Sequence, residues 1–224
     1  MTTTFALVAS PLVGPAGWQW LAGALRARGA TVIVPDLAST DSEPPVWRAH
    51  VDRVAEQLTG ATDVVLVGHS AAGRLIPLVA DGIGGAACLF LDAQLPVDVL
   101  PPGDDDWFLA HVRSIARAGV LPKWSEWWGD GAWDALVPDT TRRAALGDAL
   151  PQASLASVEE VPPAPVVPLR AAYVQLSAVY DTEAEVAAAR GWPVARLTAQ
   201  HLHFAVDEDA VADVLLETSA QLTD

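Results

Sequence analysis

The chain has 224 residues, 51% of them hydrophobic, so it can enclose one sizeable core, and two independent domains are not expected. It carries 13 Lys and Arg against 28 Asp and Glu, a formal net charge of −15, with no block of basic residues. This balance argues against nucleic acid and anionic membrane surfaces as partners and leaves a small apolar molecule as the candidate ligand.

Short apolar runs alternate with longer amphipathic runs along the first part of the chain. Strands alternating with helices predict an α/β fold, a mostly parallel doubly wound sheet whose strands end along one edge. The predicted strands are 5–9, 31–35, 63–68, 87–91, 170–176 and 194–198. The predicted helices are 17–28, 45–58, 71–80, 182–190 and 207–222.

The alternation stops after Asp92 and resumes near residue 169. The segment between contains helical patterns separated by Pro-Pro, Gly-Asp and proline-rich breaks, with no clear strand. We therefore predict a helical cap at 95–168, inserted between two parts of the core at 1–94 and 169–224. The proline-rich stretch at 161–168 predicts a stiff exit from this cap.

Tryptophan is concentrated in the predicted cap. Aromatic side chains crowded there predict an apolar roof over a substrate pocket, with Trp107, Trp124 and Trp128 as lining residues. A small helical lid also needs large side chains for its own core, and the sequence leaves both interpretations open.

The third strand breaks at Gly68-His-Ser70-Ala-Ala-Gly73 and continues into a helix. A serine in such a turn is held in a strained conformation that aims its hydroxyl into a cleft, and small neighbours let the strand and helix approach closely. This pattern predicts Ser70 as a catalytic nucleophile, although glycine and serine can also form an ordinary turn between a strand and a helix.

A serine nucleophile needs a base, and histidine has a suitable pKa. His201 and His203 follow the last strand, where the chain emerges at the same edge as Ser70. We predict His201 as the base because it is nearer the strand end. His203 is the alternative base or a residue that lines the substrate pocket.

The imidazole in turn needs a carboxylate that holds its tautomer. Asp181 and Asp92 both follow a strand, and both satisfy the chain order of serine, aspartate and histidine. We favour Asp181 because the unit after it returns the chain to His201. Asp92 is the alternative acid, or a residue that faces the substrate, and either aspartate can also serve only as a helix cap.

The oxyanion of an acyl-transfer reaction needs backbone N–H donors. The amide after the nucleophile, that of Ala71, is the first candidate. The loop after the first strand should supply the second, and since Pro11 and Pro15 have no N–H, we expect it from Leu12, with Val13 as the alternative. Trp18 opens the following helix and is a candidate for the pocket floor.

The loop Ser10-Pro-Leu-Val-Gly-Pro15, the Ser70 turn, the strand end Phe90-Leu-Asp92 and the terminal Gln200-His-Leu-His203 together resemble the α/β-hydrolases. The chain is most similar to small capped bacterial members and more distantly similar to the methylesterase and hydroxynitrile lyase group. The resemblance implies a triad of Ser70, His201 and Asp181.

Two departures from the family pattern stand out. Ala9-Ser10 replaces the usual His-Gly or His-Ser, so a polar contact at the oxyanion loop should be missing. Leu202 stands where the hydroxynitrile lyases have lysine, which argues against cyanohydrin cleavage.

These observations favour an esterase-like serine hydrolase acting on an ester, lactone or thioester of a small-to-medium apolar substrate through an acyl-enzyme on Ser70. Two alternatives remain: a non-hydrolytic lyase or cyclase of specialised metabolism on the same scaffold, and a ligand-binding protein without turnover. The sequence predicts neither a metal nor a cofactor, and it leaves the oligomeric state open, a homodimer included.

Cys88 is the only cysteine, so no intramolecular disulfide can form, and its apolar surroundings predict a buried thiol. The first residues lack the basic segment of a signal peptide, and no apolar run is long enough to span a bilayer. We therefore expect a cytoplasmic protein.

Overall fold

The computed structural model describes residues 3–37, 45–96, 106–164 and 169–222. Its centre is a six-stranded parallel sheet with the order β2-β1-β3-β4-β5-β6. The strands are β1 (Thr4–Val8), β2 (Thr31–Ile33), β3 (Val64–Ser70), β4 (Ala87–Ala93), β5 (Ala171–Gln175) and β6 (Val194–Arg196). The predicted fold class is confirmed.

Alternate residues of the central strands point into two separate cores, as the two-residue period of a strand requires. Leu7, Val67 and Leu91 face one core, whereas Val8, Leu66 and Phe90 face the other. Helices α1 (Trp18–Ala27) and α9 (Glu208–Ser219) cover the first face. Helices α2 (Val46–Gln57), α3 (Ile76–Gly82) and α8 (Asp181–Ala189) cover the second.

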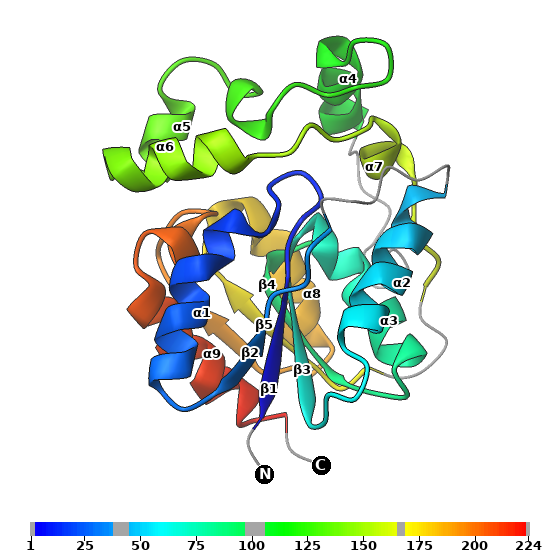
Figure 1. The fold of residues 1–224 in the computed structure, drawn as a ribbon, viewed down its shortest axis with the longest axis vertical. Coiled ribbons are helices and arrows are strands. Elements are labelled where there is room, and N and C mark those ends of the chain that lie inside the picture. The colour runs from blue at the N-terminus through cyan, green and yellow to red at the C-terminus, as the bar shows by residue number, and fades with distance from the viewer. Residues whose placement is uncertain (1–2, 38–44, 97–105, 165–168, 223–224) are drawn as a thin grey trace.

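The segment between β4 and β5 lies across the end of the molecule toward which the strands run, above α1 in Figure 1. Its described elements are α4 (Asp106–Ile115), the 3-10 turn η3 (Trp124–Glu126), α5 (Ala132–Leu136), α6 (Thr140–Ala149) and α7 (Ala156–Glu159). Within 106–164, β pairing is limited to the isolated bridges Arg117↔Val120 and Val120↔Ser154. The first predicted junction of the cap, between residues 94 and 95, lies within the described range 45–96. Residues 97–105 and 165–168, which include the second junction and the end of the proline-rich exit, lie outside the described residues.

The predicted helix at 71–80 is divided into the 3-10 turn η2 (Ala71–Arg74) and α3. Pro77 explains the restart, because proline has no N–H and is accommodated in the first turn of a helix but not in its interior. The other predicted strands and core helices are present, with ends that differ by at most three residues.

Cys88 is buried as predicted, and desolvation raises the pKa of its thiol to about 12. Over the described ranges, none of the helices has the length and apolar character needed to cross a bilayer.

Candidate active site

Ser70 ends β3 with φ 56° and ψ −128°, a strained backbone conformation for a residue other than glycine. The turn is compact because Gly73 lies directly against the end of β4. A Cβ at residue 73 would lie 2.0 Å from the carbonyl oxygen of Gln94. This glycine allows η2 to begin immediately after the serine, so Ser70 stands at the tip of the turn.

Asp92 is the extra residue of a β-bulge beside this turn. His69 pairs with Leu91 and Ser70 pairs with Ala93, so Asp92 lies between two consecutive pairs. Its φ is 44°, and the hydroxyl of Tyr173 both accepts from the Ala93 N–H and donates to the Ala93 carbonyl. A bulge re-aims a side chain, and this one directs Asp92 toward β5 and the chain beyond β6.

The fully buried carboxylate of Asp92 accepts four hydrogen bonds. The N–H groups of Leu176 and Ser177 each donate to Oδ1 at 2.8 Å. The Ser177 hydroxyl donates to Oδ2 at 2.7 Å, and Nδ1 of His201 lies 2.6 Å from the same oxygen. The carboxylate is thus fixed in position and holds a hydrogen on His201 Nδ1, which leaves Nε2 to exchange a proton.

Two aromatic side chains pack against the His201 ring. The ring centroids of His69 and His201 are 4.3 Å apart, and the His69 Nε2–H donates to the His201 carbonyl at 3.0 Å. Tyr180 stacks on His201 with ring centroids 5.3 Å apart, and its hydroxyl lies 3.4 Å from Ser70 Oγ. Burial lowers the pKa of His69 well below its usual value, so this ring is neutral and serves as an N–H donor.

The prediction that Asp181 faces the histidine is wrong. Asp181 is exposed at the start of α8, and its carboxylate accepts a hydrogen bond from the side-chain amide of Gln175. Tyr180, one residue earlier, points to the site instead. The one-residue difference arises because successive residues in a helical turn point about 100° apart.

The oxyanion loop also differs from the expectation. The Ser10 side chain is buried, and its hydroxyl accepts the Leu12 N–H at 3.3 Å, so the loop does contain a polar contact. The amides of Val13 and Gly14 donate to the Ser10 carbonyl. Ala71 is the first residue of η2, a position whose N–H has no acceptor within its own turn.

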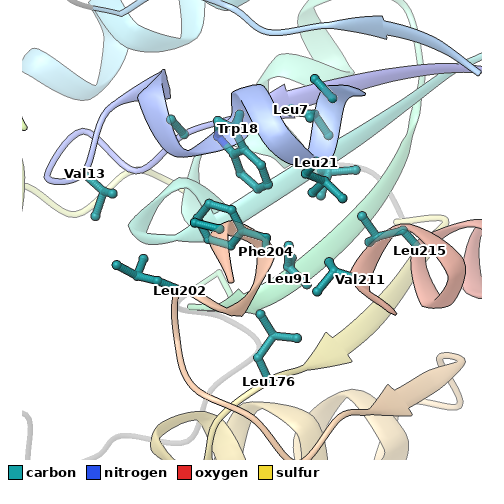
Figure 2. Close-up of a cluster of buried hydrophobic side chains, with 14 of the residues drawn as sticks. Leu7, Val13, Trp18, Leu21, Leu91, Leu176, Leu202, Phe204, Val211 and Leu215 are labelled. Atoms are coloured by element: carbon teal, nitrogen blue, oxygen red, sulfur yellow. The ribbon is translucent and has the colours of Figure 1, made fainter. Parts of the chain in front are cut away.

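The other predicted substrate contacts are spread over three environments. Trp18 is a core residue that stacks on Phe204 with centroids 4.4 Å apart (Figure 2). Trp124 is buried, and its ring centroid lies 6.0 Å from that of His201. Trp128 lies one ring further out, against Trp124 and His111.

Trp107 is 66% exposed and contacts Phe108. His203 is half-buried and begins the 3-10 turn η5 (His203–Ala205), and the histidine that contacts Asp92 is His201.

Sequence reasoning missed Ser177 and Tyr180, which both belong to the segment that leaves β5. Their only signal was position, because this segment ends at the same sheet edge as Ser70. The contact of Ser177 depends on the bulge at Asp92, which the sequence does not mark.

A family model described as "Alpha/beta hydrolase family" matches residues 10–214. The chain therefore belongs to the α/β hydrolase family. A search of curated proteins found no matching relative.

Solved structures with the same fold share little sequence with this chain. An extracellular α/β-hydrolase from a Paenibacillus species has 16% identity and a TM-score of 0.75, with coverage of 96% of this chain and 98% of the other. Tomato methylketone synthase I in complex with 2-tridecanone has 13% identity and a TM-score of 0.74, with complete coverage of both chains. A pyrethroid hydrolase from Sphingobium faniae JZ-2 has 17% identity and a TM-score of 0.63, with coverage of 97% of each chain.

Proposed function

We propose that this chain is a serine hydrolase that cleaves an ester, lactone or thioester of a small-to-medium apolar substrate through an acyl-enzyme on Ser70. The observation that carries the proposal is that Tyr180 contacts both Ser70 Oγ and the His201 ring, and that His201 Nδ1 contacts the clamped carboxylate of Asp92. Family membership and the hydrolases among the similar structures support it.

In the first half of the proposed reaction, Ser70 Oγ attacks the acyl carbon, and its proton passes to His201 Nε2. The carbonyl π electrons move to the oxygen, which receives a hydrogen bond from the Ala71 N–H. When the carbonyl re-forms, the bond to the leaving group breaks, and His201 returns the proton to that group. Asp92 stays ionised and stabilises the imidazolium.

Water completes the second half in the same way. His201 takes a proton from water as its oxygen attacks the acyl carbon, and it then protonates Ser70 Oγ as the ester bond to serine breaks. Leu12 is our candidate for the second oxyanion donor, and its N–H must turn away from the Ser10 hydroxyl before it can reach the oxyanion. Trp124 is the cap residue that we propose to contact the apolar part of the substrate, since its ring lies nearest to His201 in the aromatic cluster of the cap.

A fluorophosphonate tests the proposal without knowledge of the substrate. Intact mass should show a single adduct on the wild type and none on Ser70→Ala. Ser154→Ala is the matched control, because Ser154 lies in the segment between β4 and β5, bonded to Ser157, and should leave labelling unchanged. A folded wild type that gains no adduct, or an adduct that persists on Ser70→Ala, would contradict the proposal.

The oxyanion loop favours one second candidate, a non-hydrolytic reaction at the same site. The amides of Leu12, Val13 and Gly14 all donate to Ser10, so the resting loop does not present a second oxyanion donor. The structural likeness to methylketone synthase I accords with this alternative. Turnover in ¹⁸O-labelled water separates the two, since only hydrolysis places the label in the product.

A further inference from the structure

We infer that Tyr180 is a catalytic residue of the Ser70 site, whose hydroxyl donates a hydrogen bond to Ser70 Oγ when that atom carries negative charge. This inference rests on the proposed function. The Tyr180 side chain is separate from the proposed nucleophile, base, acid and oxyanion loop.

Tyr180 is held by the same segment that fixes Asp92. Leu176 and Ser177 bind the carboxylate, and the next residues form the 3-10 turn η4 (Ala178–Tyr180), in which the Tyr180 N–H donates to the Ser177 carbonyl. The side-chain amide of Gln175 donates to the Ser177 carbonyl and to the Asp181 carboxylate in the same segment. The tyrosine is therefore set at a fixed distance from the acid of the proposed triad.

Its two ends contact two reacting groups. The ring stacks on His201 at an interplanar angle of 20°, and the hydroxyl lies 3.4 Å from Ser70 Oγ. The side chain thus contacts both the proposed nucleophile and the proposed base. A distance of 3.4 Å is long for a neutral O–H···O bond, and hydrogen bonds shorten when the acceptor becomes charged.

The chemistry of the phenol suits a donor that keeps its proton. Tyr180 is 9% exposed, and burial raises the pKa of its hydroxyl above the usual value. Ser70 Oγ gains negative charge twice, as His201 removes its proton and as it leaves the acyl carbon during deacylation. The Tyr180 O–H stabilises that charge in both steps while the proton itself moves between Ser70 and His201.

Tyr180→Phe removes the hydroxyl and keeps the ring on His201. With a fluorophosphonate as probe, we expect the maximal labelling rate to fall about 10- to 100-fold, with less than a threefold change in the probe concentration that gives half of that rate. The midpoint of thermal unfolding should remain close to that of the wild type. Trp192→Phe is the control, because Trp192 lies in the same β5–α8–β6 unit but stacks on Phe90, and it should label at the wild-type rate.

A second measurement leaves the chain unmutated. The chain has 2 tyrosines, so ¹³C at the tyrosine Cζ gives two signals. Phosphonylation of Ser70 should move one of them, from Tyr180, because the hydroxyl of Tyr173 is bonded to the backbone of Ala93. Two unmoved signals would overturn the role of Tyr180.

The outcomes separate the inference from the function on which it rests. A wild type that labels and a Tyr180→Phe that labels equally fast or faster would remove Tyr180 from the mechanism and leave the serine hydrolase intact. A wild type that does not label at all would overturn both.

Discussion

Asp92 and His201 are 109 positions apart in the chain and meet through a 2.6 Å contact between Oδ2 and Nδ1. The contact depends on two strained residues on neighbouring strands. Ser70 and Asp92 both have positive φ, and the bulge that accommodates Asp92 lies directly opposite the Ser70 turn. The two strands thus present the nucleophile and the carboxylate of the proposed triad from one local irregularity of the sheet.

Asp92→Asn should lower kcat/KM for an aryl ester about 10³- to 10⁴-fold. The Asn oxygen can still accept from Leu176 and Ser177, but its NH₂ group would then face His201 Nδ1 and force the proton onto Nε2. Asp181→Asn is the matched control, since Asp181 bonds Gln175, and it should change kcat/KM less than about threefold. Equal losses in the two variants would contradict the assignment of Asp92.

The alternation of strands and helices was enough to predict the sheet, because the two-residue period and the glycine-bounded turns are local signals. The same signals located Ser70 and His201 at one edge. They could not separate Asp92 from Asp181, since both residues follow a strand. That choice depends on a bulge stabilised by the Tyr173 hydroxyl, 80 residues from Ala93, and no local pattern encodes such a contact.

The tryptophans between β4 and β5 show how far the sequence can predict. Crowded tryptophans indicated either a pocket roof or a lid core, and the structure divides them by depth: Trp124 lies against His201, Trp128 lies behind Trp124, and Trp107 is largely exposed. Such a division depends on how the helices pack, which the composition of the cap does not specify.

Gly73→Ala should destabilise the protein by more than about 3 kcal/mol, or about 10 °C in the midpoint of thermal unfolding. The new Cβ would lie 2.0 Å from a backbone oxygen, so neither the turn nor β4 can yield without moving Ser70 or Asp92.

Gly23→Ala is the opposite control. Apart from the neighbouring backbone of α1, the described residues place no heavy atom within 4 Å of a Cβ at this exposed position, and alanine is the better helix former. We expect Gly23→Ala to raise the free energy of unfolding by about 0.5–1 kcal/mol. Similar destabilisation by both changes would show that the contact with Gln94 is not what requires glycine at 73.

The free energy of unfolding should decrease as the pH falls below about 6.5, the ordinary pKa of histidine. Burial lowers the pKa of both His69 and His50 in the folded state, so the unfolded chain binds their protons first. Each histidine that protonates only on unfolding contributes a slope of up to about 1.4 kcal/mol per pH unit. Urea unfolding between pH 5 and pH 8 measures this slope.

His69→Gln isolates the larger of these contributions. Its side-chain amide can still donate to the His201 carbonyl, as His69 Nε2 does, but it does not titrate. The slope should therefore decrease by up to about 1.4 kcal/mol per pH unit relative to the wild type. A slope unchanged by the substitution would mean that His69 is not a source of the acid sensitivity.

Arg142 should couple α6 to the hydrolase core by about 1–2 kcal/mol, measured in a double-mutant cycle of Arg142→Met and Glu208→Gln. Two guanidinium nitrogens bind the Glu208 carboxylate at 2.5 and 2.9 Å, and the guanidinium group also lies over Trp20 and donates to the Ala205 carbonyl. The two side chains are only 28% and 22% exposed, so salt should screen the pair weakly.

The pair of Arg53 and Glu56 provides the matched comparison within the same protein. It is a single contact on one face of α2, with side chains 38% and 71% exposed, and its coupling should stay below about 0.5 kcal/mol and vanish in 1 M NaCl. If the Arg142 cycle gave the same small and salt-sensitive value, the bidentate contact would not stabilise the attachment of α6. A coupling that persists in salt, together with slower fluorophosphonate labelling of Arg142→Met, would link that attachment to the turn that follows His201.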